Sequence, residues 1–282
     1  MGGRYTGRRG SAKFAARRAG RKSLARPRGL GVTSGSAPML HGQQLTVVVP
    51  AYNTGARVAR VVATMPAVVD RVVVVDDASA DDTAAHLAAC ADPRLETVRH
   101  AENRGVGAAI ATGYLRALAG GADLVAVMAG DGQMHPDDLV PLATPVALGR
   151  ADYAKGNRLA HPDCLRVMPW TRLAGNVALS ALTRAATGAR VDDSQCGYTV
   201  VSARALRRFD VTRLWGRYGY PNHLLGALAQ AGLRVVDVTV RPVYADERSG
   251  VRLRDALVTV PRVLALVAWA RLRAEPLLEV RA

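Results

Sequence analysis

Two segments of the chain place acidic side chains directly after runs of apolar residues. Asp76 and Asp77 follow four consecutive valines, and Asp131 lies between two glycines after a later apolar run. A carboxylate at the end of a buried strand is costly unless a ligand or a cation uses it. Such groups accept hydrogen bonds from a nucleobase or supply the oxygen ligands that Mg²⁺ prefers. Helix capping is the alternative, and it suits the residues that follow, Ser79, Asp81 and Asp82.

Two further segments have the composition of ligand-binding loops. The first segment ends a strand with Pro50 and continues with Tyr52 and Asn53, so its aromatic ring could pack against a flat base. A tyrosine at this place could equally be an ordinary residue at the edge of the core. The second, E-N-R-G-V-G-A-A at 102–109, has two glycines before a helix, where backbone can approach a ligand and Arg104 can meet a phosphate. Neither segment is a dinucleotide fingerprint or a P-loop.

Strands and helices must alternate to bring these loops to one edge of a sheet. Continuous apolar runs predict strands buried on both faces, and the segments between them predict helices. The predicted strands are 45–49, 71–75, 95–99 and 124–128, and the predicted helices are 57–65, 81–91, 107–119 and 136–149. This alternation predicts an α/β protein with a doubly wound, mostly parallel sheet, in which ligands bind at the carboxyl ends of the strands.

The order of these motifs resembles glycosyltransferase family 2, whose members have the GT-A nucleotide-diphospho-sugar transferase fold. The resemblance is carried by P-A-Y-N at 50–53, V-D-D-A-S-A-D-D-T at 75–83, N-R-G-V-G at 103–107 and G-D-G-Q-M-H-P at 130–136. Three later motifs agree, namely K-G-N-R at 155–158, D-S-Q-C-G-Y at 193–198 and Y-G-Y-P-N-H-L-L at 218–225. The set is most similar to the dolichyl-phosphate mannose synthase-like branch, which moves a sugar from a nucleotide to a polyprenyl phosphate. It covers about residues 45–250.

The resemblance implies roles for the matching positions. It places Pro50, Tyr52 and Asn53 around the nucleotide and Asp76 or Asp77 on the base. Near the ribose and diphosphate it places Asn103, Arg104, Gly105 and Gly107. Gln133 would also bind the donor. It makes Asp131 the ligand of a Mg²⁺ or Mn²⁺ cofactor. The residues near the sugar, the diphosphate or the acceptor phosphate would be Lys155, Arg158, Gln195 and Arg248. Catalysis would rest on Asp131, Arg158 and His223.

Three positions depart from the family pattern. The metal motif commonly reads D-A-D-G-Q, but Ala129 replaces its first aspartate, so one carboxylate, diphosphate oxygens and water would hold the cation. His223 stands where many relatives carry an acidic base. A histidine can act as a base near neutral pH or as a structural hydrogen-bonding group, and the sequence favours neither role. Thr54 replaces the usual glutamate of the first motif.

The expected reaction is an inverting, metal-dependent transfer of a sugar from a GDP- or UDP-sugar to a polyprenyl or dolichyl phosphate. A phosphate acceptor is already anionic at neutral pH, so it tolerates the loss of an acidic base at position 223. One alternative keeps the donor and uses a soluble small-molecule or glycan hydroxyl, with His223 as the base. Alternatives of another class are a non-catalytic nucleotide-sugar-binding module, suggested by Ala129, and a nucleic-acid-binding protein that uses a basic tail.

The composition bounds these hypotheses. The 282 residues are 49% hydrophobic and 22% charged, which excludes a fully disordered, collagenous or coiled-coil chain. No apolar run reaches the length of a membrane-spanning helix. Three widely separated cysteines indicate a reducing, cytoplasmic setting without a disulfide framework. The net charge of +15 includes ten lysines and arginines within the acid-free residues 1–42, so the body is only mildly basic. The body has no aromatic stacking platform, and we do not expect specific nucleic-acid binding.

We therefore expect three parts. Residues 1–42 would be a disordered basic tail, although a transit peptide or a true start at Met39 also fits, and residues 43–245 would be the GT-A catalytic domain. Residues 246–282 would form an amphipathic helical appendage. Its segment 253–273 interleaves apolar residues with arginines. We expect the first part of this segment to pack on the domain and its basic end to lie peripherally at the inner face of a membrane, near the lipid acceptor.

Overall fold

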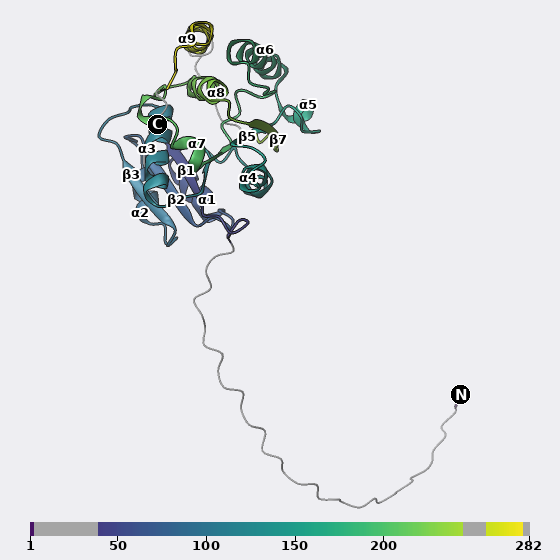
Figure 1. Ribbon diagram of the computed structural model, residues 1–282. Coiled ribbons are helices and arrows are strands. Elements are labelled where there is room, and N and C mark those ends of the chain that lie inside the picture. Colours follow the sequence, from purple (N-terminus) through teal and green to yellow (C-terminus); the bar gives the residue numbers. More distant parts are fainter. Residues whose placement is uncertain (3–38, 245–257, 279–282) are drawn as a thin grey trace, which may run out of the picture. The chain divides into compact units, whose positions relative to one another are not determined.

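The computed structural model describes residues 1–2, 39–244 and 258–278, and the described residues build a seven-stranded sheet (Figure 1). The strands are β1 Leu45–Ala51, β2 Arg71–Asp76, β3 Leu95–Arg99, β4 Leu124–Val127, β5 Tyr153–Asn157, β6 Thr199–Ser202 and β7 Val235–Thr239. Their order across the sheet is β3-β2-β1-β4-β6-β5-β7.

Neighbouring strands are parallel except at β6, which runs antiparallel to both β4 and β5. Two reversals cancel, so β5 points in the same direction as β4. The carboxyl ends of β1, β2, β4 and β5 therefore meet along one side of the sheet, which we call the carboxyl edge. The predicted mostly parallel α/β sheet is confirmed.

Helices cover both faces of the sheet. They are α1 Ala56–Ala63, α2 Thr83–Ala88, α3 Val106–Ala119, α4 Leu139–Ala147, α5 Cys164–Val167, α6 Trp170–Thr187, α7 Ala203–Leu206, α8 Tyr220–Gln230 and α9 Val260–Arg273, with short 3-10 helices at Pro136–Asp138 and Val211–Arg213. Alternate β1 side chains point to opposite faces. Val47 and Val49 pack with α1 and α4, and Val48 packs with α3 and α8, so the sheet is doubly wound as predicted.

The strand pattern of the sequence misses β5, β6 and β7. β5 carries Lys155 and Asn157, whose polar side chains break the apolar run although both are buried. β6 has only four residues, and β7 is only partly buried. Fully apolar strands such as β2 were recognisable because nothing polar interrupts them before Asp76.

Two predicted helices differ in extent because hydrogen-bonded turns precede them. The Asp81 carboxylate accepts hydrogen bonds from the Thr83 backbone N–H and hydroxyl, and α2 begins only at Thr83. The predicted helix at 136–149 divides in two. The imidazole of His135 accepts from the N–H of Asp137 to start a 3-10 turn, and α4 follows from Leu139.

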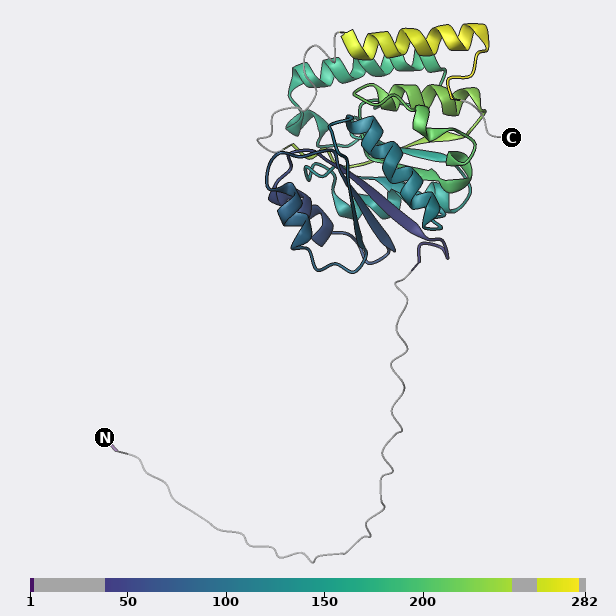
Figure 2. The same ribbon diagram turned by 90° about the vertical axis from the view of Figure 1, so that its left-hand side faces the viewer.

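The predicted C-terminal appendage contains α9. This helix lies beside α6, and both pack against α8 (Figure 2). Its buried side is made by Val260, Val263, Leu264, Val267 and Ala270. Residues 253–257 of the predicted helix, residues 3–38 of the predicted tail, and Arg248 lie outside the described residues. Among the helices that are described, none is long and apolar enough to cross a membrane.

Candidate functional site

The loops after β1 and β2 are tied to each other at the carboxyl edge. The backbone N–H of Asn53 donates to the Ser79 hydroxyl at 2.9 Å, and the Asn53 side-chain oxygen accepts from the Ala80 N–H at 2.8 Å. Asn53 has a left-handed backbone with φ of 52°, which asparagine tolerates better than most residues. The backbone N–H and the side chain of Asn53 therefore hold the two loops together. Tyr52 is 51% exposed beside it and offers an aromatic face to solvent.

The two carboxylates at the end of β2 are buried and have separate partners. Asp76 accepts from the Ser79 N–H at 2.9 Å through one oxygen and from the Arg99 guanidinium at 2.7 Å through the other. Asp77 accepts from the backbone N–H groups of Arg104 and Gly105 at 2.9 and 2.7 Å. Asp77 also has the His100 ring beside one of its oxygens, so Asp76 keeps more capacity to accept another hydrogen bond than Asp77 does.

A histidine that the sequence analysis did not single out completes the Asp77 cluster. The Nδ1 atom of His100 lies 2.7 Å from Asp77 Oδ1, and its Nε2 atom lies 3.0 Å from the Thr112 hydroxyl. His100 is the first residue after β3, and Thr112 belongs to α3. Asp77 and His100 therefore link two strand ends, the 103–105 loop and α3, so Asp77 positions the loop that was predicted to meet the donor.

The two glycines of that loop are required by another part of the chain. A Cβ on Gly105 would lie 2.6 Å from the carbonyl oxygen of Gly216, and a Cβ on Gly107 would lie 2.0 Å from that of Trp215. The Ala108 N–H also donates to the Gly216 carbonyl at 3.0 Å. We predicted that these glycines let backbone approach a ligand, which stays a prediction. The structure adds a separate reason for glycine, because a Cβ at either position would clash with the segment 215–217.

The metal motif forms the loop after β4. Gly130 packs closely enough on β1 that its N–H lies 3.3 Å from the Pro50 carbonyl. Asp131 is partly exposed, and its Oδ1 accepts from the Gln133 N–H at 3.0 Å. Within the described residues, no three His, Cys, Asp or Glu side chains gather in a way that could hold a metal. The chain thus brings one carboxylate, with Gln133 two residues away, to the place where a cation was expected.

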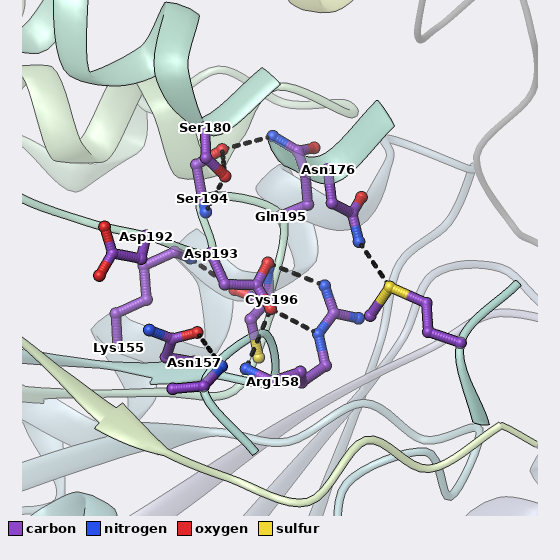
Figure 3. Close-up of polar contacts among 12 residues, drawn as sticks. Lys155, Asn157, Arg158, Asn176, Ser180, Asp192, Asp193, Ser194, Gln195 and Cys196 are labelled. Atoms are coloured by element: carbon purple, nitrogen blue, oxygen red, sulfur yellow. Dashed lines mark hydrogen bonds and ion pairs between the residues drawn. The ribbon is translucent and has the colours of Figure 1, made fainter. Parts of the chain in front are cut away.

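Lys155 lies beneath this edge and is fully buried. Its ammonium donates to the Cys196 carbonyl at 2.5 Å, and burial lowers the pKa of the ammonium (Figure 3). We predicted that Lys155 lies near the sugar, the diphosphate or the acceptor phosphate, and this role stays a prediction. The side chain has no exposed surface and supports the loop 192–197 through the Cys196 carbonyl.

Arg158 is fixed by Asp193 in a two-point ion pair. The Arg158 Nε and Nη2 atoms donate to the two Asp193 oxygens at 2.7 and 3.0 Å, and the N–H groups of Arg158 and Cys196 donate to the same carboxylate at 3.1 Å (Figure 3). Burial alone raises the pKa of a carboxyl, but the hydrogen bonds and charge of Arg158 hold the pKa of Asp193 below its ordinary value. Asp193 is fully buried, whereas the Arg158 side chain is 19% exposed. A rigid cation therefore borders the carboxyl edge.

Gln195 belongs to the same loop as Asp193. Its amide nitrogen donates to the Ser194 hydroxyl at 2.9 Å, and Ser194 in turn bonds to Ser180 of α6 (Figure 3). The loop is therefore anchored to β5 on one side and to α6 on the other. The motif D-S-Q-C-G-Y marked the loop in the sequence, but its spacing alone does not reveal that Asp193 pairs with Arg158.

His223 lies in the first turn of α8 and is 5% exposed. Its Nδ1 is 3.4 Å from the Trp215 N–H, a long contact in which the ring nitrogen accepts. Burial lowers the pKa of the imidazole from 6.5 to about 4. The ring is therefore neutral at physiological pH and a weak base, so the geometry favours the structural one of the two roles that the sequence left open.

Comparisons with known proteins agree with the motif order. The family model for glycosyl transferase family 2 matches residues 46–215. The UDP-N-acetylglucosamine–dolichyl-phosphate N-acetylglucosaminyltransferase of Methanococcus voltae is 27% identical over 215 residues, which cover 71% of this chain and 86% of that protein. Polyprenol monophosphomannose synthase of Mycolicibacterium smegmatis is 30% identical over 231 residues, covering 77% and 86%.

A solved structure shares the fold. The crystal structure of glucosyl-3-phosphoglycerate synthase from Mycobacterium tuberculosis, in complex with Mn²⁺, uridine diphosphate and glucosyl-3-phosphoglycerate, matches with a TM-score of 0.63. The match covers 81% of each chain at 20% sequence identity. At this identity the likeness concerns the fold, and it agrees with the GT-A architecture expected from the sequence.

The Gly107 contact generates a first prediction. Gly107→Ala would force a Cβ against the Trp215 carbonyl, and we expect the free energy of unfolding to fall by about 3 kcal/mol. Gly175 is the matched control, because it lies within α6 with nothing within 4 Å of its Cβ position. Gly175→Ala should leave stability unchanged or raise it by up to about 1 kcal/mol. Equal stability of both variants in urea unfolding would contradict the close approach.

The Arg158 pair generates a second prediction. Asp193→Ala removes a fully buried acceptor of four hydrogen bonds and leaves a mostly buried cation unpaired, so we expect a loss of about 3–5 kcal/mol in the free energy of unfolding. Asp163→Ala breaks an exposed pair with Arg166 and should cost less than about 1 kcal/mol. Similar losses for both variants in chemical denaturation would show that removing the buried pair costs no more stability than removing an exposed one.

His223 generates a third prediction, on the pH dependence of stability. The unfolded chain protonates this histidine below pH 6.5, whereas the folded chain resists protonation down to about pH 4. Stability from this group is therefore complete above pH 6.5 and is lost as the pH falls toward 4. Between pH 7 and pH 5, wild type should lose about 2 kcal/mol more than His223→Asn, whose amide oxygen can replace Nδ1. Parallel losses in the two proteins would exclude a depressed pKa.

Proposed function

The chain belongs to glycosyl transferase family 2 and is a glycosyltransferase, and on this premise we propose that it transfers a sugar from a nucleotide-diphospho-sugar to the phosphate of a polyprenyl lipid. The observation that carries the choice of acceptor is the state of His223. A sugar hydroxyl needs a base to take its proton, and a buried neutral imidazole with a pKa of about 4 is a poor one. A phosphate monoester brings its own negative charge and needs no such base.

The donor would bind along the carboxyl edge. Tyr52 would pack on the base, and Asp76 would accept a hydrogen bond from a base N–H, since its oxygens have the larger remaining capacity. Asn103 and the exposed Arg104 would lie toward the ribose and diphosphate on the loop that Asp77 holds. Both GDP- and UDP-sugars fit this arrangement, because these contacts do not distinguish the two bases.

A divalent cation fits the loop after β4 if the donor completes its ligands. Asp131 would give one carboxylate oxygen, Gln133 lies close enough in sequence to add its amide oxygen, and diphosphate oxygens and water would fill the remaining positions. When bound, Mg²⁺ or Mn²⁺ would neutralise the charge that develops on the leaving diphosphate. Ala129 cannot contribute, so the affinity for the cation would depend strongly on the donor.

The transfer would be a displacement with inversion. An oxygen of the acceptor phosphate would attack the anomeric carbon, and the bond from that carbon to the diphosphate oxygen would break as the nucleoside diphosphate leaves with the electron pair. Arg158 would orient an anionic group, because Asp193 fixes its guanidinium while part of it remains exposed. Gln195, on the same anchored loop, would lie beside that group.

The relatives support this acceptor and leave one alternative. The names of two similar proteins, from Methanococcus voltae and Mycolicibacterium smegmatis, specify dolichyl phosphate and polyprenol monophosphomannose. The fold neighbour from Mycobacterium tuberculosis was crystallised with glucosyl-3-phosphoglycerate, which is not a lipid. Transfer to a small soluble acceptor, with His223 as base, is therefore the competing hypothesis.

The deciding experiment measures sugar transfer by the purified full chain with Mn²⁺ or Mg²⁺. UDP- and GDP-sugars are each offered with a short polyprenyl phosphate, with the corresponding free prenol, and with 3-phosphoglycerate. We expect product only with the prenyl phosphate, and loss of that product with EDTA. Product with phosphoglycerate alone would replace the proposed acceptor by a soluble one.

Two variants separate the roles within the same assay. Asp131→Asn should abolish transfer, and unchanged turnover would remove it from the metal site. His223→Asn should retain at least a tenth of the wild-type rate with prenyl phosphate, because no proton has to be removed from that acceptor. A drop of a thousandfold with normal folding would make His223 a base and favour the hydroxyl acceptor.

A further inference from the structure

The outer sides of α5, α6 and α9 leave large apolar side chains in solvent. Leu165 and Trp170 are both 77% exposed, and α6 also exposes Val177 and Leu182, at 49% and 54%. Trp269 and Leu272 are exposed on α9 at 46% and 87%. Monomeric proteins seldom leave so many large apolar groups together unless the surface binds something. We call these six residues the outer helical surface.

The packing of the helices makes this one surface. The buried residues of α6, including Ser180 and Thr183, and those of α9, including Val263 and Val267, lie on the opposite sides of their helices. α6 and α9 pack side by side on α8, with Ala186 against Val260 and Leu264 in a small apolar cluster (Figure 2). Their exposed sides therefore both turn away from α8. α5 joins α6 through two residues, which brings Leu165 next to Trp170 along the chain.

The charges on the three helices have one sign. Their charged side chains are all arginines, Arg166, Arg172, Arg184, Arg262, Arg271 and Arg273, and the helices contain no Asp, Glu or Lys. Arg273 lies over the Trp269 ring at 4.6 Å from its centre, so a cation and an aromatic ring are presented together. Two acids outside the helices pair with arginines on them, Asp163 with Arg166 and Asp192 with Arg184. Apolar groups bordered by arginines match the boundary between acyl chains and anionic headgroups.

We propose that the outer helical surface docks on an anionic lipid bilayer, with Trp170, Leu182 and Trp269 entering the headgroup boundary. A second copy of the chain is a poorer occupant. A twofold contact would bring this surface against itself and place arginines opposite arginines without an acidic partner on these helices. A bilayer offers both an apolar layer and negative charge, so it satisfies both properties of the surface.

This inference deepens the proposed function, since a polyprenyl phosphate is held in a bilayer, and it goes beyond the sequence prediction. The sequence indicated only the basic end of the C-terminal helix. Most of the surface now lies on α5 and α6, between the motifs K-G-N-R at 155–158 and D-S-Q-C-G-Y at 193–198. The loop 192–197 is bonded to α6 through Ser180 and Ser194, so the docking helix is joined directly to the loop that fixes Arg158.

The test uses the full chain and vesicles of phosphatidylcholine with 30% phosphatidylglycerol, compared with pure phosphatidylcholine. The anionic vesicles carry brominated acyl chains, which quench only tryptophans that reach the acyl boundary. The chain has three tryptophans, two of them on the surface, and residues 1–42 contain none, so binding through the basic tail does not produce the signal. We expect flotation with the anionic vesicles and quenching that falls by about half in Trp170→Phe.

A pair of double variants tests the surface itself. Val177→Glu with Leu182→Glu places two anions on it, and vesicle affinity should fall at least tenfold. Leu115→Glu with Leu148→Glu alters two residues of similar exposure, 40% and 43%, on α3 and at the end of α4, and should bind as wild type does. Binding that is equal in both double variants, or binding without quenching, overturns the proposal. If light scattering shows that the wild type is a dimer and that the first double variant is a monomer, the surface binds a second copy of the chain instead.

Sugar transfer is measured separately on a short, water-soluble prenyl phosphate. The Val177→Glu and Leu182→Glu variant should retain wild-type turnover on this acceptor, because neither side chain belongs to the site. Vesicle binding without any transfer would contradict the proposed function and leave the docking surface intact. Sugar transfer by a wild-type protein that does not bind vesicles would support the proposed function and contradict the docking surface.

Discussion

The buried ion pair between Arg158 and Asp193 determines the geometry of one half of the carboxyl edge. One carboxylate receives the Arg158 guanidinium, the Arg158 N–H and the Cys196 N–H, so it fixes the end of β5 and the loop 192–197 at once. Lys155 supports the same loop through the Cys196 carbonyl. Such pairs contribute little net stability compared with apolar packing, but they permit few alternative arrangements. The interaction is therefore best understood as a determinant of shape.

The other half of the edge uses the same device with different chemistry. Asp77 gathers two backbone N–H groups and His100, just as Asp193 gathers its donors. In each half a buried carboxylate organises a loop. The side chains nearby that reach solvent are suited to meet a ligand: the exposed Tyr52 and Arg104 on one side and the partly exposed Arg158 on the other. In the proposed reaction, Ala129 and His223 shift two tasks to the substrates. The donor would complete the cation's ligands, and the acceptor would arrive already charged.

The sequence predicted the parts of this arrangement that depend on local pattern. Apolar runs revealed β1, β2 and β4, and the residues that follow them revealed the loops of the carboxyl edge. It could not reveal interactions between distant segments. The sequence placed Lys155 near the sugar or a phosphate, but it gave no sign of the hydrogen bond to Cys196, 41 residues later. It marked Gly107 as a ligand-binding glycine without showing that Trp215 lies against it. The exposed side of α6 was also invisible, because a helix whose apolar residues surround it gives no sign of which side is left uncovered.

The contact between the 103–107 loop and the segment 215–217 has a consequence for the exchange of parts among relatives. The two segments lie more than a hundred residues apart, yet each is shaped to the backbone of the other, and the second leads directly into α8. A chimera that takes the loop from one family member and the α8 region from another would join two surfaces that were never fitted together. Recombination within this fold should therefore treat both segments as one inherited unit, although a gene would carry them far apart.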